Sequence, residues 1–395
     1  MSAPAALAPP PGHPRFPHVD GLRALAALGV VAVHVSALAG VTASSWAGAY
    51  TARLNVGVAI FFCVSGFLLY RPFAAAAHAG RARIRTGDYL RRRALRIVPA
   101  YWLALTVLAI YPGLPGVFTR DWWIYYGFGQ IYQVRTTLGG ISPAWTLCVE
   151  VTFYLALPVY AVLAARATRG LPSAVAARRE LSALGALSLA SLAFRAVLFH
   201  HPRGHVAIST LPGMVTWFAG GMALAVLSVR AELGGTPERL SALARRPWLP
   251  WLAALGLFWV AATRIGAPRT YDPADYTAFG FAAEHVLYAA IAALVVLPAV
   301  LGAGERGARR VLATPALSAI GVVSYGLFLW HLPLLVALRD DAGVTGWPGL
   351  AVLGLAASLA CATLSYVLVE RPALRRKEGS RGAAERARRL AAAGR

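Results

Sequence analysis

An arginine and a histidine interrupt the apolar stretch that follows Asp20 and ends at Ala39. Arg23 stands near its start, and His34 lies deep inside it, 11 positions further on. At 3.6 residues per helical turn this spacing is almost three turns, so both side chains lie on one face of a helix. The rise between them is roughly 16 Å, about half of a bilayer core. Ionisable groups inside a membrane span are costly and usually face a cavity or a partner, which makes His34 a candidate functional residue.

A carboxylate on another apolar segment is a candidate partner for His34. Glu150 lies about seven residues inside PAWTLCVEVTFYLALPV, which begins at Pro143. If this helix runs opposite to the one that carries His34, the two side chains reach a similar depth, and pairing would lower the burial cost of both. In such a pair the histidine could take up a proton while the carboxylate fixes its tautomer.

A second basic group precedes the third apolar run, in the segment YLRRRALRIVPAY. Arg92 and Arg96 share a helix face, and Arg93 lies beside them. The paired donors of guanidinium groups suit phosphate, which favours an anionic ligand. The other interpretation is a juxtamembrane anchor for anionic lipid.

Ten apolar runs of about 17–25 residues are long enough to cross a bilayer. They lie near 21–39, 54–72, 93–112, 142–164, 181–200, 206–228, 248–264, 277–301, 315–338 and 347–370. The chain is 58% hydrophobic, with a mean hydropathy of +0.59. The sequence therefore predicts an all-α polytopic integral membrane protein with about ten transmembrane helices.

The net charge of +22 follows the loops and is not gathered in one patch. Connections after even-numbered runs, with the C-terminal tail, hold 28 Arg and Lys residues, and connections after odd-numbered runs hold seven. By the positive-inside rule both termini are cytoplasmic. The basic residues then face membrane lipids, not nucleic acid. A cleaved signal peptide is a competing interpretation, because Arg15 and Arg23 precede an apolar core that ends in Ala37-Leu38-Ala39.

The chain divides into three parts. Residues 1–19 are expected to be a disordered cytoplasmic lead, residues 20–372 the ten-helix domain, and residues 373–395 a basic cytoplasmic tail. The longest external connection, 113–141, carries the aromatic segment WWIYYGF and could contain a re-entrant or interfacial piece. The three cysteines lack metal-ligand spacing, so no disulfide or metal site is predicted.

Several charged residues near helix ends have simple interpretations. Arg195, Glu284 and His285 lie close to external ends, where snorkelling to water would satisfy them. The Glu370-Arg371 pair is interpreted as an interfacial ion pair before Pro372 ends the last helix.

Two further polar positions leave alternatives open. Ser65-Gly66 in the second run favours close helix packing and also permits a contact with a ligand. His331, near Pro333, is either a hydrogen-bonded histidine at a kink or part of a pocket lining.

Six motifs in order resemble the bacterial membrane-bound acyltransferase family 3, from Asp20 to Pro372. They are the arginine, ten residues, histidine pattern from Arg23 to His34; the FFxxSGFLL-like second run; RRxxRIxPxY from Arg92 to Tyr101; WTLxxExxFYL from Trp145 to Leu155; SYxxxLWHxP from Ser324 to Pro333; and SYxxxExP from Ser365 to Pro372. Each motif is weak alone, and the six together are specific. The one departure is a threonine, Thr146, where serine is common.

The resemblance implies an enzyme of the bacterial plasma membrane that moves an acyl group, usually acetyl, from cytoplasmic acetyl-CoA to a hydroxyl group. The implied acceptors are a cell-envelope glycan, a glycolipid or lipid-linked sugar, or a macrolide-like metabolite. Acyl-CoA is a co-substrate, with no tightly bound cofactor and no metal. The resemblance implies His34 and Glu150 as the catalytic pair and Arg23, Arg92, Arg93 and Arg96 as donor-binding residues. Its implied pocket lining is Asp20, Ser65, Trp145, Thr146, Tyr154, Tyr325 and His331.

A proton-coupled transporter or flippase is the main alternative, because His and Glu relays inside spans are also typical of pumps. That class is expected to show inverted repeats and broken helices near the midplane. The sequence shows no repeat relating its two halves, and no G-x-S-x-G, Walker or H-E-x-x-H motif. The sequence leaves open which acceptor, acyl chain length and oligomeric state apply.

Overall fold

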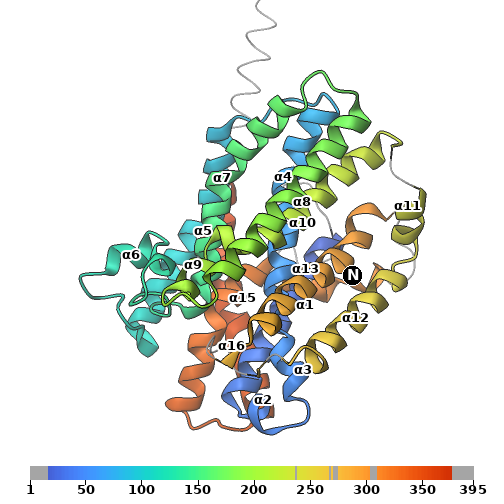
Figure 1. Ribbon diagram of the computed structural model, residues 1–395. Coiled ribbons are helices and arrows are strands. Elements are labelled where there is room, and N and C mark those ends of the chain that lie inside the picture. The colour runs from blue at the N-terminus through green and yellow to red at the C-terminus, as the bar shows by residue number, and fades with distance from the viewer. Residues whose placement is uncertain (1–16, 236–237, 267, 270–274, 303–308, 376–395) are drawn as a thin grey trace, which may run out of the picture.

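The computed structural model describes residues 17–235, 238–266, 268–269, 275–302 and 309–375, and every regular element in these ranges is a helix (Figure 1). Nine helices in the described ranges are long and apolar enough to cross a membrane. They are α1 (Pro17–Leu38), α4 (Val56–His78), α5 (Thr86–Leu108), α7 (Trp145–Ala167), α8 (Ser173–Leu198), α10 (Leu211–Glu232), α13 (Ala278–Leu301), α15 (Pro315–Asp340) and α16 (Trp347–Ser365). The prediction of an all-α polytopic membrane protein is confirmed.

The remaining predicted span, 248–264, is a shorter helix, α12 (Trp248–Thr263), of 16 residues. Its length of roughly 24 Å is less than the thickness of a bilayer core. It packs along α13 and runs between α11 (Glu238–Arg245) and α3 (Gly48–Arg53), as Figure 1 shows. The helix is therefore present at the predicted position, although it is shorter than a full span.

Turn chemistry accounts for several helix starts. A proline stands in the first turn of α10, α15 and α16, where its missing N–H costs nothing. The side chain of Thr277 caps α13 by accepting a hydrogen bond from the Gly280 N–H at 3.0 Å.

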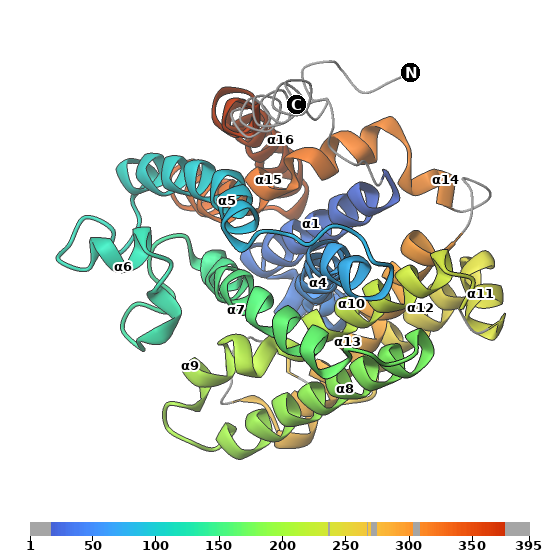
Figure 2. The ribbon, with the colours of Figure 1, turned by 90° about the horizontal axis from the view of Figure 1, so that it is seen from above.

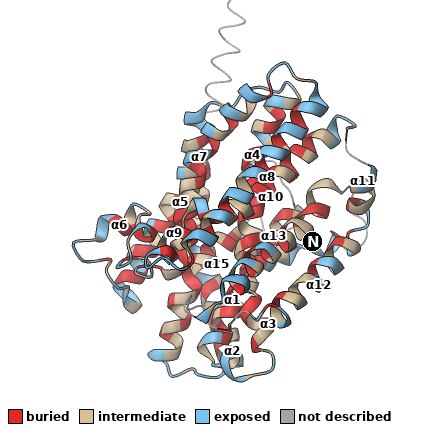
Figure 3. Ribbon diagram, viewed as in Figure 1, coloured by how far each residue is buried: buried red, intermediate tan, exposed pale blue. Residues whose placement is uncertain are grey.

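The helices α1, α4 and α10 lie near the centre of the bundle (Figure 2), and buried residues concentrate on these inner helices (Figure 3). Two of the glycines in the bundle allow close approaches between neighbouring backbones. A Cβ atom on Gly66 of α4 would stand 2.2 Å from the Phe218 carbonyl oxygen of α10, and one on Gly321 of α15 would stand 2.0 Å from the Asp20 carbonyl oxygen of α1. The Gly66 contact confirms the close-packing interpretation of that position. The central place of α1 favours a retained span over a cleaved signal.

The connection between α5 and α7 contains short helices, α6 (Trp122–Tyr126) and η3 (Gln130–Tyr132), and no spanning helix within its described residues. It docks on the side of α5. The Tyr101 hydroxyl donates to the Tyr125 carbonyl at 2.9 Å, and the Trp102 indole donates to the Tyr126 carbonyl at 3.0 Å. Other short elements are α2 (Val41–Ser44), η2 (Ala109–Gly113), η4 (Ser142–Ala144), α9 (Gly204–Ile208), α14 (Arg309–Leu312) and η6 (Tyr366–Glu370).

Most of the predicted terminal segments lie outside the described residues, namely 1–16 of the lead and 376–395 of the tail. The helix α1 begins at Pro17, inside the predicted lead. Its first turns and the end of η6 lie at the same end of the bundle, because Glu370 interacts electrostatically with Arg23.

The prediction that Arg195, Glu284 and His285 snorkel to water is wrong, because all three are buried. Arg195 is 5% exposed. Its guanidinium donates to the carbonyl of Gly213 at 3.2 Å and stacks over the Phe281 ring, 4.4 Å from the centroid. The nearby carbonyls replace water as acceptors.

Glu284 forms a buried ion pair with Arg53, whose Nη1 lies 2.6 Å from the Glu284 Oε2 atom. The side chains are 11% and 1% exposed, respectively. Tyr276 also donates to the carboxylate, at 3.2 Å. Burial and the Glu284 carboxylate together raise the pKa of Tyr276 to about 12, which keeps this donor protonated at neutral pH.

Breaking this pair is expected to destabilise the protein. Arg53→Ala leaves the Glu284 carboxylate buried without its counter-charge, which costs about 3–5 kcal/mol of unfolding free energy. Denaturation of the detergent-solubilised protein measures the loss. The control is Arg339→Ala, because the pair between Arg339 and Asp340 is 37% and 49% exposed, and exposed ion pairs contribute little to stability. Equal losses in the two variants would contradict the assignment of a buried, structurally important pair.

Candidate active site

Three half-buried arginines form a cluster at the end of the bundle where α5 begins. Arg23 lies near the start of α1, and Arg93 and Arg96 lie one turn apart on α5. The charge of Arg96 interacts with those of Arg23 and Arg93. The described part of the chain gives none of the three a hydrogen bond or close ion pair, and the Arg93 Nε atom is buried without a partner. We call these three residues the arginine cluster. Mutually repelling guanidiniums with unused donors are suited to bind an anion.

The aromatic residue Tyr89 extends this arrangement, although the sequence did not single it out. It is buried on α5 and interacts electrostatically with Arg92, Arg93 and Glu150. Arg92, the fourth predicted donor-binding residue, is half buried on the same helix. The signal in the sequence is the position of Tyr89 one turn before the arginines, in YLRRR.

Glu150 lies within electrostatic range of the arginine cluster, since its carboxylate interacts with Arg23 and Arg93. The Ser65 hydroxyl of α4 donates a hydrogen bond to it. Ser65 therefore lines the site while its neighbour Gly66 packs against α10. Tyr154, one turn after Glu150 on α7, is buried and hydrogen bonded to the same carboxylate.

Glu370 is a second carboxylate at the arginine cluster. It interacts electrostatically with Arg96 and Arg23, is 4% exposed, and its Oε1 atom is buried without a hydrogen-bond partner among the described residues. The interpretation of Glu370 as part of an interfacial ion pair is therefore wrong. The π-helical turn η6, which packs against α5, places this side chain inward. The available signal was the SYxxxExP motif, whose glutamate is Glu370.

The two histidines of the site lie in direct contact. The Nε2 atom of His331 on α15 is 3.2 Å from the Nδ1 atom of His34 on α1, and the ring centroids are 5.0 Å apart. The His34 Nδ1 atom is also 2.8 Å from the Val30 carbonyl oxygen. The His34 ring is half buried, and its Nε2 atom makes no hydrogen bond to a described residue. That nitrogen is available to a ligand.

The predicted pairing of Glu150 with His34 is not seen in the described part of the chain, where each has other partners. The reason lies in the packing of the helices. The helix α1 packs mainly on α15 and α4, whereas α7 packs on α4 and α5. Ser65 of α4 thus reaches Glu150, and His331 of α15 reaches His34. Equal depth in the membrane places two side chains at the same height, but it does not show whether their helices are neighbours.

Of the remaining predicted lining residues, Tyr325 and Asp20 lie near the arginine cluster, and Trp145 and Thr146 lie at the start of α7. Tyr325 interacts electrostatically with Glu370 and Glu150, and its hydroxyl donates to the Ile97 carbonyl at 3.0 Å, so it joins α15 to α5 beside the arginine cluster. Asp20 interacts with Arg23. Trp145 and Thr146 begin α7, and the Thr146 hydroxyl donates to the Pro143 carbonyl at 3.1 Å, so this hydroxyl is used within the first turn.

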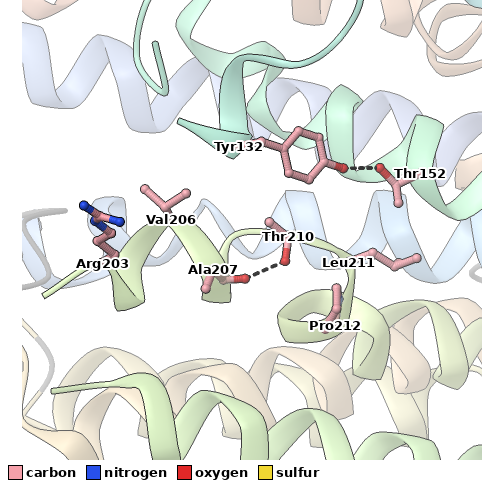
Figure 4. A pocket seen from close by; sticks show the side chains of 8 residues that line it. All are labelled: Tyr132, Thr152, Arg203, Val206, Ala207, Thr210, Leu211 and Pro212. Atoms are coloured by element: carbon pink, nitrogen blue, oxygen red, sulfur yellow. Dashed lines mark hydrogen bonds between the residues drawn. The ribbon is translucent and has the colours of Figure 1, made fainter. Parts of the chain in front are cut away.

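A cavity of about 430 Å³ opens on another face of α7 (Figure 4). Thr152 lies on its wall, only two residues after Glu150, and a two-residue step turns a helix by roughly 200°, so the cavity does not belong to the arginine cluster. The Tyr132 hydroxyl and the Thr152 hydroxyl are 2.5 Å apart there. The other residues around it are Arg203, Val206, Ala207, Thr210, Leu211 and Pro212.

The described residues contain no group of three His, Cys, Asp or Glu side chains that could hold a metal ion. The cysteines Cys63 and Cys148 are buried, and Cys361 is partly buried.

Membrane helices around a group of arginines, carboxylates and histidines define the class of this protein, a multi-pass membrane protein. The particular family follows from comparison with known families, because residues 16–367 match the one described as an acyltransferase domain. The chain belongs to this family, acyltransferase family 3.

Several curated proteins are similar to the chain. Peptidoglycan O-acetyltransferase OatA of Listeria monocytogenes is 24% identical over 375 residues, which cover 90% of this chain and 55% of that protein. Nodulation protein 10 of Rhizobium leguminosarum bv. viciae is 27% identical over 343 residues, covering 81% and 82%. Putative peptidoglycan O-acetyltransferase YrhL of Bacillus subtilis is 24% identical over 383 residues, covering 91% and 55%. The chain thus spans about half the length of two of these relatives. No solved structure matches it.

Proposed function

We propose that this membrane acyltransferase moves an acyl group, acetyl in the first instance, from acyl-CoA bound at the arginine cluster to a hydroxyl group activated by His34. One observation carries the proposal. Arg23 has no hydrogen bond or close ion pair to a described residue, and it is followed along the same face of α1, roughly 16 Å further on, by His34, whose Nε2 atom makes no hydrogen bond to a described residue. The guanidiniums suit the phosphates of the nucleotide end of the donor. The distance to His34 suits its extended pantetheine arm.

The chemistry needs only a base and a donor-binding site. A thioester already has a good leaving group. The reaction therefore mainly needs a general base that deprotonates the acceptor hydroxyl as its oxygen attacks the acyl carbon. His34 takes that proton on Nε2 and returns it to the departing thiolate. The carbon–sulfur bond breaks and the carbon–oxygen bond forms, with no net change in the enzyme.

Glu150 belongs to the donor-binding part of the proposed site because it lies beside the arginine cluster. Its carboxylate, held by Ser65 and Tyr154, offsets part of the positive charge of the arginine cluster and orients Arg23 and Arg93. In this role it belongs to donor binding, so Glu150→Gln is expected to change donor affinity more than it changes the rate at saturating donor.

The proposed orientation places the arginine cluster and both termini on the cytoplasmic side of a bacterial plasma membrane. The distribution of Arg and Lys among the loops supports it. Donor then enters from the cytoplasm, where acyl-CoA is made, and the acceptor enters from the other half of the bundle.

The acceptor class is argued from the relatives alone. Two of them carry peptidoglycan O-acetyltransferase in their names. A cell-envelope glycan or its lipid-linked precursor is therefore the first acceptor to test, followed by glycolipids and macrolide-like metabolites.

The test uses purified protein in nanodiscs with radiolabelled acetyl-CoA and a panel of these acceptors. We expect wild-type protein to release CoA and to label one acceptor class. In vesicles of both orientations, we expect donor to be consumed only where the side bearing the arginine cluster faces the added acetyl-CoA. Failure to bind or consume acyl-CoA under all these conditions would reject the proposed function.

A further inference from the structure

His331 determines which ring nitrogen of His34 is free. We infer that His331 is a positioning residue for the transfer reaction, because its Nε2 atom accepts a hydrogen bond from His34 Nδ1 and leaves His34 Nε2 unprotonated. The inference rests on the proposed function of His34. It replaces the carboxylate expected as the partner of His34 with a second, neutral imidazole.

The first step is the protonation of His331 itself. Its Nδ1 atom lies 2.8 Å from the Phe328 carbonyl oxygen and 3.2 Å from the Leu327 carbonyl oxygen. Carbonyl oxygens only accept hydrogen bonds, so Nδ1 must carry the proton. A neutral imidazole has one proton, and the Nε2 atom of His331 is therefore an acceptor with a lone pair.

The second step follows for His34. Its Nδ1 atom faces two acceptors, the Val30 carbonyl oxygen at 2.8 Å and the His331 Nε2 atom at 3.2 Å. A lone pair on Nδ1 would be repelled by both, so Nδ1 carries the proton and is shared between them. The lone pair of neutral His34 is then on Nε2, the nitrogen that makes no bond to a described residue.

Packing holds the two rings in this relation. His331 is fully buried, at 0% exposure, and the Phe328 ring lies against it, with centroids 5.9 Å apart. The backbones of α1 and α15 approach closely because Gly321 has no side chain at the crossing. A 180° rotation of the His331 ring would put the Cδ2–H group in place of the Nδ1–H donor beside the carbonyl oxygens, so the ring has one favourable arrangement.

The arrangement has a defined use in the reaction. As the acceptor oxygen attacks the thioester carbon, His34 Nε2 takes the hydroxyl proton and becomes an imidazolium. The Nδ1–H donor of the imidazolium is then charged, which strengthens its hydrogen bond to His331 Nε2. The proton on Nε2 passes to the thiolate when the carbon–sulfur bond breaks. His331 holds and stabilises its neighbour without exchanging a proton.

The experiment compares His331→Ala and His331→Gln with wild type, using two measurements on protein in nanodiscs. The first is the ¹⁵N signature of ring-labelled His34, assigned by its loss in His34→Ala, which reports the nitrogen that carries the proton. The second is acyl transfer at varied acetyl-CoA. The control is His285→Gln, a buried histidine on α13 that lies outside the site.

We expect His34 to be protonated on Nδ1 in wild type and in His285→Gln, and to become a mixture of tautomers in His331→Ala. The wrong tautomer is costly when a histidine acts as base, so kcat should fall about 10- to 100-fold with the KM for donor unchanged. The glutamine carbonyl can accept from His34 Nδ1, so His331→Gln should recover part of kcat.

Two results would overturn the inference. One is an unchanged His34 tautomer in His331→Ala. The other is a loss of activity that accompanies a loss of folded protein and is not recovered in His331→Gln. Failure of the proposed function is a separate result, since wild type would then transfer no acyl group, and the tautomer measurement alone would decide the role of His331.

Discussion

A His34→Ala variant is expected to lose acyl transfer by about 10²–10⁴-fold, the range that a positioned general base contributes. Its affinity for acyl-CoA should be retained, because the arginine cluster lies roughly 16 Å away along α1. Initial rates and donor binding, measured on the same nanodisc preparation, separate the two effects. The matched control is His200→Ala, an exposed histidine just after α8, which should behave as wild type.

The pH dependence of wild type tests the same role with a defined sign. Protonated His34 has no lone pair, so transfer should fall as pH drops through the range in which an imidazole titrates, near 6.5 in its unperturbed form. The acid limb should be missing from the residual activity of His34→Ala. If His34→Ala keeps more than a tenth of wild-type kcat, then His34 is not the base.

The elements that position the site were predictable from the sequence because they depend on local patterns. Apolar run lengths predicted the membrane helices, and only α12 is shorter than a full span. The spacing of Arg23 and His34 predicted one helix face, and the segment after Arg92 predicted a basic helix. Each of these depends on residues within one helix, where the 3.6-residue period relates position to direction.

The partners of these residues were not predictable, because they depend on which helices are neighbours. His331 is 297 residues from His34, and nothing in either segment encodes that α15 lies against α1. Glu370 was predicted to lie at the membrane interface because it is close to the end of the last helix. The π-helical turn η6, which redirects that side chain toward the arginines, has no local signature in the sequence. The snorkelling prediction for Arg195 and Glu284 was wrong for the same reason, since their partners come from other segments.

The difference between patterns within one helix and contacts between helices explains why the predicted pairing of Glu150 with His34 is not seen in the described residues. Depth along a helix can be counted from the sequence, whereas rotation and lateral order require packing. The close approach at Gly66 places α10 beside α4, and the one at Gly321 places α15 beside α1, which also packs on α4. The Glu150 carboxylate thus lies with the arginines, and His34 has a histidine as its neighbour.

Removing one guanidinium from the arginine cluster is expected to weaken donor binding. Each of Arg23→Ala, Arg93→Ala and Arg96→Ala removes charge-assisted hydrogen bonds worth about 1.5–3 kcal/mol. That corresponds to about a 10- to 100-fold rise in the Kd or KM for acetyl-CoA. The value of kcat at saturating donor should change little, because His34 is untouched. Arg93→Lys keeps the charge but not the paired donors, and should lie between alanine and wild type.

The same variants distinguish a donor site from an anchor for anionic lipid, the other interpretation of the basic segment. The matched control is Arg83→Ala, an exposed arginine in the connection between α4 and α5, which lowers the net charge by the same amount. A general electrostatic effect would weaken donor binding equally in Arg83→Ala and Arg93→Ala, and added salt would remove both effects. A donor site predicts a loss only in the cluster variants, and a smaller loss when the donor itself lacks its 3′-phosphate. If the cluster variants change only the binding of anionic lipid, with the Kd for acetyl-CoA unaltered, then the arginines are an anchor and the donor binds elsewhere.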